Sequence, residues 1–173
     1  MDFVSIFLIA IALSMDAFAV AIAQGLSSKG KEFHMAFSFG FFQAFMPVIG
    51  WATGMEAKNL ISSTSYVASL ILLLIGIKMI FEAGEMEKME ITLTAIIILS
   101  IATSIDAMAA GVSLSLMGES IILPAIIIGM VTFFVSMSGF FISGRVKRSY
   151  MAEIFGGIIL IALGLRILLQ ESM

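Results

Sequence analysis

The chain has 173 residues, of which 61% are hydrophobic and only 12% charged, with a formal net charge of −3 and no cysteine. Soluble domains average about 45–50% apolar and about 25% charged residues, so this chain has too few charges to cover a surface in water. Its mean hydropathy of +1.16 indicates a membrane protein without a separate aqueous domain, which argues against nucleic-acid binding, enzyme sites outside the membrane, disulfides and thiolate metal sites.

Hydropathy along the chain predicts an all-α polytopic membrane protein with six membrane-spanning helices in one membrane domain, residues 1–173. A spanning helix needs about 20 residues, so six spans would use roughly 120 residues of the chain. The six apolar segments are Phe3–Leu26, Phe33–Gly54, Thr64–Phe81, Ile91–Leu116, Ile121–Ser143 and Met151–Leu169.

The first span carries an acidic residue, Asp16, near its middle, in the segment Ser14-Met15-Asp16-Ala17-Phe18-Ala19. An ionised aspartate at the centre of a membrane helix costs about 2.5–3.5 kcal/mol unless its charge is neutralised. Ala12, Ala19 and Ala23 share its helical face, and small residues at this spacing let a neighbouring helix approach closely. We therefore expect Asp16 to face the protein interior.

The second span contains Gln43 and, one turn later, Pro47. Because proline has no N–H, the backbone carbonyl one turn before it loses its helical partner. The amide oxygen and this carbonyl are candidate cation ligands, and hydrogen bonding between helices is the alternative role of Gln43. Lys78 and Arg166, near the ends of the third and sixth spans, are interpreted as interfacial anchors, with electrostatic gating as the alternative.

The fourth span carries Asp106 near its middle, with Thr103 and Ser113 on the same helical face. Ser14 and Ser104 each lie two residues before an aspartate, too far around a regular helix to share its face fully. They would contribute a hydroxyl only where the helix is locally unwound.

Three features of the first half recur in order in the second, which predicts an internal repeat of residues 1–85 and 86–173. The pattern Ser-x-Asp-Ala-x-Ala recurs at an offset of 90, Gly40 and Gly50 at 89, and Gly76-Ile77-Lys78 at 88. A unit with an odd number of spans enters the membrane from opposite sides in its two copies. Inverted repeats of this kind are typical of secondary transporters, whose substrate site lies near the midplane at the repeat interface.

Positive charges in the loops predict the orientation of the chain, because cytoplasmic loops carry an excess of Lys and Arg. The loops after spans one, three and five hold six basic residues, and the opposite side holds two, Lys58 and Arg166. Both termini are therefore predicted to be extracytoplasmic. The six are Lys29, Lys31, Lys88, Arg145, Lys147 and Arg148.

The available ligands predict a site for a divalent cation near the midplane. Two carboxylates match one doubly charged ion, and carboxylate, amide, hydroxyl and carbonyl oxygens suit a harder divalent ion. The 14 methionines would suit Cu(I), but they form no loop cluster and are better explained by packing. The predicted metal site comprises Asp16, Asp106, Gln43, Thr103, Ser14 and Ser104.

Several segments together resemble the MntP-type manganese efflux pumps of the LysE-like transporter superfamily, over nearly the whole chain. They are Leu13–Ala21, Phe41–Pro47, Gly76–Glu82, Ile101–Ala107 and Ala152–Gly157. The resemblance implies export of Mn²⁺ across a bacterial or archaeal plasma membrane, with Asp16 and Asp106 matching the family's intramembrane acidic residues. Family members commonly begin the third span with Asp-His-Trp, where this chain has Thr64-Ser65-Tyr66, so that acidic residue and histidine have no equivalent here.

These observations lead to one hypothesis and two alternatives. The hypothesis is a secondary transporter, not an enzyme and without a cofactor, that exports Mn²⁺ in exchange for protons. Protons from outside would displace the ion from Asp16 and Asp106, and the neutral carboxylates would return. The alternatives are an exporter of another divalent metal or small cationic metabolite, and a non-transporting membrane scaffold subunit.

Overall fold

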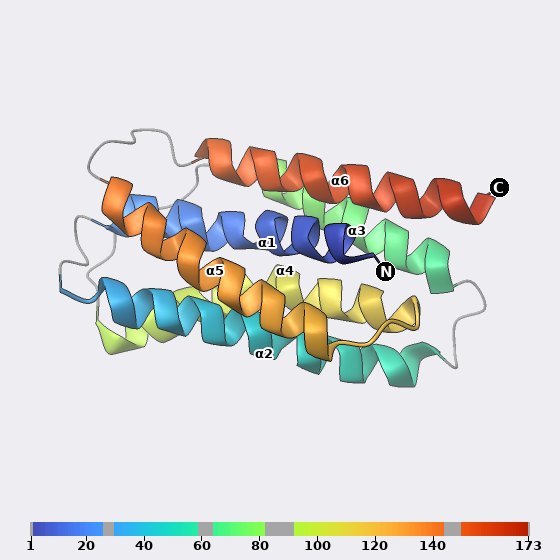
Figure 1. Ribbon diagram of the computed structural model, residues 1–173, viewed down its shortest axis with the longest axis horizontal. Coiled ribbons are helices and arrows are strands. Elements are labelled where there is room, and N and C mark those ends of the chain that lie inside the picture. Colours follow the sequence, from blue (N-terminus) through green and yellow to red (C-terminus); the bar gives the residue numbers. More distant parts are fainter. Residues whose placement is uncertain (1, 26–29, 59–63, 82–91, 144–149, 173) are drawn as a thin grey trace.

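The protein is described from a computed structural model over residues 2–25, 30–58, 64–81, 92–143 and 150–172. These residues form six α-helices, as predicted, and contain no strand (Figure 1). The helices are α1 (Phe3–Gln24), α2 (Glu32–Lys58), α3 (Thr64–Phe81), α4 (Leu93–Leu116), α5 (Ile122–Ile142) and α6 (Tyr150–Ser172). The predicted boundary between residues 85 and 86 lies outside the described residues.

The helices have the length and the surface of a membrane bundle. Four of them, α1, α2, α4 and α5, are long and apolar enough to cross a membrane, and the described apolar stretches of α3 and α6 are shorter, Tyr66–Ile75 and Gly157–Leu169. Large apolar side chains such as Phe41, Phe134 and Leu74 are exposed on the outside of the bundle, where lipid would solvate them. The chain is therefore an all-α, multi-pass membrane protein.

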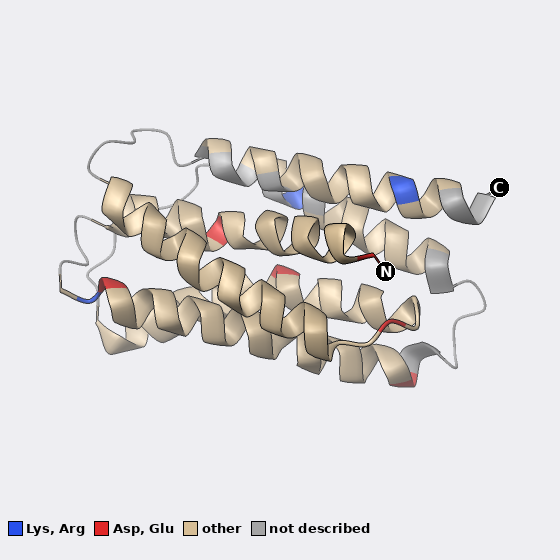
Figure 2. Ribbon diagram, viewed as in Figure 1, with Lys and Arg blue, Asp and Glu red and all other residues tan. Residues whose placement is uncertain are grey.

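Figure 2 shows how sparse charge is along the helices, with most of each ribbon free of charged residues. Lys31, immediately before α2, is exposed. The other five basic residues of the loops after spans one, three and five lie outside the described part of the chain, whereas Lys58 and Arg166 lie in α2 and α6. Figure 1 shows both termini at the same end of the bundle, so they face the same side of a membrane.

Each helix of the first half runs antiparallel to its counterpart in the second half. Figure 1 shows this for α1 and α4, for α2 and α5, and for α3 and α6. The pairs in contact also correspond: α2 packs on α4 as α5 packs on α1, and α3 packs on α4 as α6 packs on α1. The main remaining contacts join counterparts, α2 with α5, α3 with α6 and, less extensively, α1 with α4. These relations are compatible with an inverted repeat, which stays a prediction.

Glycines mark the closest approaches, and these too come in corresponding pairs. A Cβ on Gly50 would overlap the backbone carbonyl of Met108, and one on Gly139 would lie 3.1 Å from the carbonyl of Phe18. Gly50 and Gly54 both lie against α4, so this pair of small residues one turn apart serves helix packing. Gly40 and Gly129 face each other, each Cβ position 2.9 Å from the other's carbonyl oxygen. Only glycine permits backbones to approach this closely.

An aliphatic cluster at the centre joins five helices and holds the two aspartate-bearing segments in place. Small residues on α1 and α4 pack together with longer side chains of α3, α5 and α6. The members are Ile9, Ala10, Ala12, Leu13, Leu72, Ile75, Ala107, Ala110, Ile128, Leu160 and Leu163.

Candidate functional site

The two aspartate-bearing segments, Leu13–Ala21 and Ile101–Ala107, meet at one residue of α2, Gln43. Its side-chain Nε2 donates to the carbonyl oxygen of Leu13 at 2.8 Å, and its Oε1 accepts from the hydroxyl of Ser104 at 2.9 Å. Gln43 is only 1% exposed. The interhelical hydrogen bonding that was one of its two expected roles is therefore observed, and it brings the first segment within one side chain of the second.

Pro47 places a second acceptor near this amide. The helix continues through Pro47, and because proline has no N–H to donate, the Gln43 carbonyl is left without its usual helical partner. Gly111 lies directly against the Pro47 carbonyl, so this stretch of α2 backbone is packed on α4. The Gln43 carbonyl is therefore an acceptor on the same residue whose side chain reaches Ser104.

Asp106 is buried, 7% exposed, and forms an ion pair with Lys78, whose Nζ lies 2.9 Å from Oδ1. The interpretation of Lys78 as an interfacial anchor was wrong. The reason is the axial position of α3, which places its last turn beside the middle of α4. The aliphatic stem of Lys78 packs along the helices while the ammonium reaches the carboxylate, leaving the lysine side chain 43% exposed.

Asp16 lies on α1 one turn after Leu13, in a half-buried position. Small buried residues surround it along the helix, among them Ala12, Ala17 and Ala19. The helix is regular through the aspartate. That Asp16 and Asp106 bind one ion together stays a prediction.

The other predicted hydroxyls turn toward their own helices. Ser14 donates to the Ile11 carbonyl at 2.7 Å, and Thr103 donates to the Ser100 carbonyl at 3.2 Å. Neither helix is unwound at these positions. Ser104 reaches Gln43 from a regular helix, so the unwinding expected to bring it into the site is unnecessary.

Thr132 on α5, the counterpart of Gln43 at an offset of 89, is fully buried. Its hydroxyl has no hydrogen-bond partner among the described residues, while Ser136 one turn later donates to the Thr132 backbone carbonyl. A buried hydroxyl without a partner costs about 1–3 kcal/mol, which points to a ligand or water in that position. The correspondence of Thr132 to Gln43 in the predicted repeat is the sequence signal that could have identified Thr132 as a site residue.

Around these residues the donors are neutral oxygens and single carboxylates. Within the described part of the chain, no three His, Cys, Asp or Glu side chains gather as a metal cluster. A cation held here would be bound by an aspartate together with amide, hydroxyl and carbonyl oxygens, which is a ligand set for a hard ion.

Comparisons with known proteins agree with the resemblance noted from the sequence. A family model described as "Putative manganese efflux pump" matches residues 27–168. Proteins named as putative MntP manganese efflux pumps are 45% identical in Methanothermobacter thermautotrophicus (99% of this chain, 98% of that one) and 46% in Methanoregula boonei (97% of both). A third, from Maridesulfovibrio salexigens, is 36% identical over 98% of this chain and all of that protein. No solved structure matches.

Proposed function

The chain belongs to the MntP family, and on that membership we propose that it exports Mn²⁺ from the cytoplasm in exchange for protons, through a site built on Asp16 and Asp106. The family is one of efflux transporters, not enzymes. The observation that carries the site assignment is the Gln43 amide, which joins the two aspartate-bearing segments by hydrogen bonds to Leu13 and Ser104. A transporter that binds one ion with both halves needs such a junction.

The proposed binding step uses the two carboxylates as charged ligands. Asp16 and Asp106 balance the two charges of Mn²⁺. Gln43 and Thr103 supply neutral oxygens, and Ser14 and Ser104 supply hydroxyls after rotation away from their present acceptors. Mn²⁺ accepts such oxygen ligands readily, and an aliphatic cluster that includes Leu13 and Ala107 lies next to these ligands along α1 and α4.

The proposed release step uses protons. Each ionised aspartate in mid-membrane costs about 2.5–3.5 kcal/mol, so the empty carrier changes conformation readily only with its carboxylates neutralised. Protonation from outside would neutralise both. At Asp106 the ammonium of Lys78 offers a second means, so Mn²⁺ must displace Lys78 before it can bind that carboxylate.

The proposed orientation places both termini outside the cytoplasm, in a bacterial or archaeal plasma membrane. It is supported by the excess of basic residues in the loops after α1, α3 and α5. The shared end of the two termini in Figure 1 agrees with it.

Flux measurements in proteoliposomes test the proposal. An Mn²⁺-sensitive dye and a pH-sensitive dye inside the vesicles would report ion and proton movement together. We expect Mn²⁺ flux coupled to opposite proton flux, lost in Asp16→Asn and Asp106→Asn and retained in Glu56→Gln, an exposed carboxylate of α2. Unchanged Mn²⁺ flux in both aspartate variants would rule out the site, and Mn²⁺ flux without proton flux would rule out the exchange.

One observation favours a cationic metabolite as a second candidate substrate. The Lys78 ammonium lies against the Asp106 carboxylate, so the site accommodates an amine. Competition of putrescine with Mn²⁺ in the same flux assay separates the candidates. Inhibition and transport of putrescine at concentrations similar to those of Mn²⁺ would favour the amine, whereas competition only by divalent metals would favour Mn²⁺.

A further inference from the structure

Two basic residues at corresponding positions, one in α3 and one in α6, have different partners and so break the correspondence between the halves of the bundle. Lys78 on α3 and Arg166 on α6 are counterparts at an offset of 88. Lys78 lies on Asp106, so the same packing of α6 on α1 would place Arg166 at Asp16. Instead, Arg166 Nη1 donates to the Ser5 hydroxyl at 2.7 Å and lies 3.6 Å from Asp2 Oδ1.

The different partners of Lys78 and Arg166 correspond to a shift of α3 and α6 along the axes of α4 and α1. Asp2 precedes Asp16 by 14 residues, which is about 21 Å at the α-helical rise. Because α3 and α6 are antiparallel, sliding both in one direction moves Lys78 forward along α4 and Arg166 backward along α1. The two halves of the bundle would be symmetric if the α3–α6 pair were shifted along α1 and α4 by half of this offset. The shift is roughly 10 Å.

Contacts between α3 and α6 are more extensive than the contacts of either helix with α1 or α4. Helices α3 and α6 pack along each other (Figure 1), with the Cβ position of Gly164 3.0 Å from the Ser69 carbonyl. Their surface toward α1 and α4 is aliphatic. The hydrogen bond from Ser113 to the Ala68 carbonyl is long, 3.3 Å, and the same hydroxyl has an alternative acceptor in Ala109.

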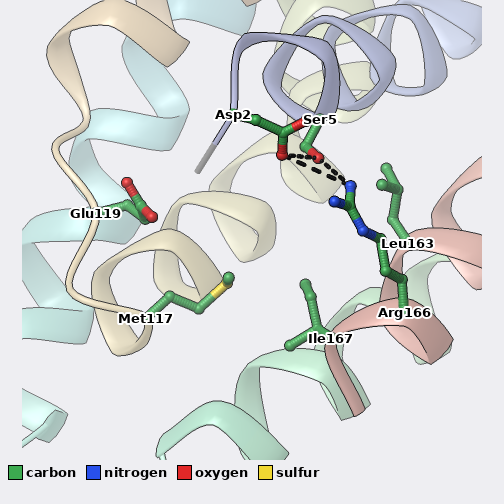
Figure 3. A pocket seen from close by; sticks show the side chains of 7 residues that line it. All are labelled: Asp2, Ser5, Met117, Glu119, Leu163, Arg166 and Ile167. Atoms are coloured by element: carbon green, nitrogen blue, oxygen red, sulfur yellow. Dashed lines mark hydrogen bonds and ion pairs between the residues drawn. The ribbon is translucent and has the colours of Figure 1, made fainter. Parts of the chain in front are cut away.

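A cavity of about 270 Å³ lies where Arg166 ends, between the start of α1, the end of α4 and α6. Figure 3 shows Arg166 reaching across it to Asp2 and Ser5, with Glu119 on the opposite wall. The cavity is at the end of the bundle that holds both termini. The counterparts of Asp2, Ser5 and Arg166 are Thr92, Ala95 and Lys78, so sliding the α3–α6 pair the other way would bring Lys78 to the opposite end of the bundle.

We infer that α3 and α6 slide as one unit between two positions, and that Lys78 and Arg166 exchange partners as they do. In the described position Lys78 pairs with Asp106 and Arg166 with Asp2 and Ser5. In the other position Arg166 pairs with Asp16, and Lys78 leaves Asp106 and lies near Thr92 and Ala95. The sliding stands on geometry alone, and its link to Mn²⁺ rests on the proposed function.

Disulfide cross-linking tests the sliding directly, because the natural chain has no cysteine. Ser5→Cys with Leu163→Cys reports the described position, since both residues line the cavity. The counterpart pair, Ala95→Cys with Ile75→Cys, reports the other position. In the described position Lys78, one turn after Ile75, pairs with Asp106, which is about 16 Å along α4 from Ala95, so this pair cannot form a disulfide there.

We expect both pairs to cross-link in oxidised membrane vesicles, with the counterpart pair giving the lower yield. Lys78→Gln should raise the ratio of counterpart to described cross-link about fivefold, as loss of a partly exposed ion pair allows. Ser38→Cys with Ser100→Cys is the control, because these hydroxyls lie 2.7 Å apart across α2 and α4.

Failure of the Ala95/Ile75 pair to cross-link in every background, with the other two pairs reacting, would overturn the sliding. A cross-link unaffected by Lys78→Gln would overturn the exchange of ion partners. Mn²⁺ flux is measured separately on the same vesicles. If the cross-links show sliding but Mn²⁺ flux is absent, the proposed function is contradicted and the sliding stands. If Mn²⁺ flux is present but the cross-links show no sliding, the sliding is contradicted and the proposed function stands.

Discussion

The Ser104 hydroxyl donates to the Gln43 side-chain oxygen across the α2–α4 interface, at 2.9 Å. Gln43 in turn donates to the Leu13 carbonyl of α1. Two helices that carry the predicted ion ligands are thus held in register by one amide. In lipid, where apolar surface gives little drive for helix association, such bonds and close packing determine the register.

Replacing Gln43 should therefore disturb transport more than folding. Interhelical hydrogen bonds in membranes average about 0.6 kcal/mol, so Gln43→Ala should lower the free energy of unfolding by about 1 kcal/mol. We expect Mn²⁺ flux to fall at least tenfold, because both aspartate segments lose their common contact. Unfolding in SDS and flux in proteoliposomes measure the two effects. Gln43→Ala and Ser104→Ala should be non-additive in stability, and full additivity would contradict a direct bond between them.

Helix positions were largely predictable from hydropathy, and side-chain partners were not. Thr64–Phe81 was predicted with the ends observed for α3, because an apolar run of spanning length has one arrangement in lipid. The end of α2 lies at Lys58 and not at Gly54, since a membrane helix can extend into water beyond its apolar segment. Lys78 was assigned to the membrane interface because it lies near the end of an apolar segment. Its contact with Asp106 depends on the position of α3 along α4, which hydropathy cannot predict.

The lysine that faces Asp106 should compete with the transported ion. Lys78→Gln removes a cation that lies 2.9 Å from the carboxylate, and a partly exposed ion pair contributes up to about 1 kcal/mol. We expect the variant to bind Mn²⁺ about fivefold more tightly, and Lys78→Arg to bind it like the natural chain. Calorimetric titration of the purified protein with MnCl₂ measures the change. Weaker binding in Lys78→Gln would show that Lys78 supports the site and does not compete for it.

The glycine at the α2–α4 contact should be irreplaceable. A Cβ on Gly50 would overlap the Met108 carbonyl, and relief requires the two backbones to separate. Gly50→Ala should cost about 1–3 kcal/mol, the range for overpacked cores. Ala52→Leu adds more volume two residues away on an exposed face and should leave the thermal stability in detergent unchanged. Equal melting temperatures for Gly50→Ala and the natural chain would show that the helices are farther apart than described.

The carboxyl group at the amino end of α1 should titrate at an unusually low pH. The hydrogen bond from Ser5 lowers the pKa of Asp2, and the charge of Arg166 lowers this pKa further. Because the pKa is lowered by folding, the stabilisation is present above the ordinary pKa of 3.8 and is lost as the pH falls through the lowered value. Carbon NMR of labelled Asp2 should show its pKa rising in Ser5→Ala, and rising less in Arg166→Gln. No rise in Ser5→Ala would contradict the hydrogen bond.

Substitution of Thr132 should distinguish a role in helix packing from a role in binding the ion. Its buried hydroxyl has no partner among the described residues, so Thr132→Val, which keeps the shape, should leave stability unchanged or raise it by up to about 1 kcal/mol. If the hydroxyl is a ligand, the same change should weaken Mn²⁺ binding several-fold. Ser136→Ala is the matched control, because Ser136 already donates to the Thr132 carbonyl and its loss should not change Mn²⁺ affinity. Equal Mn²⁺ affinity in Thr132→Val and the natural chain would restrict the site to α1, α2 and α4, with α5 contributing only packing.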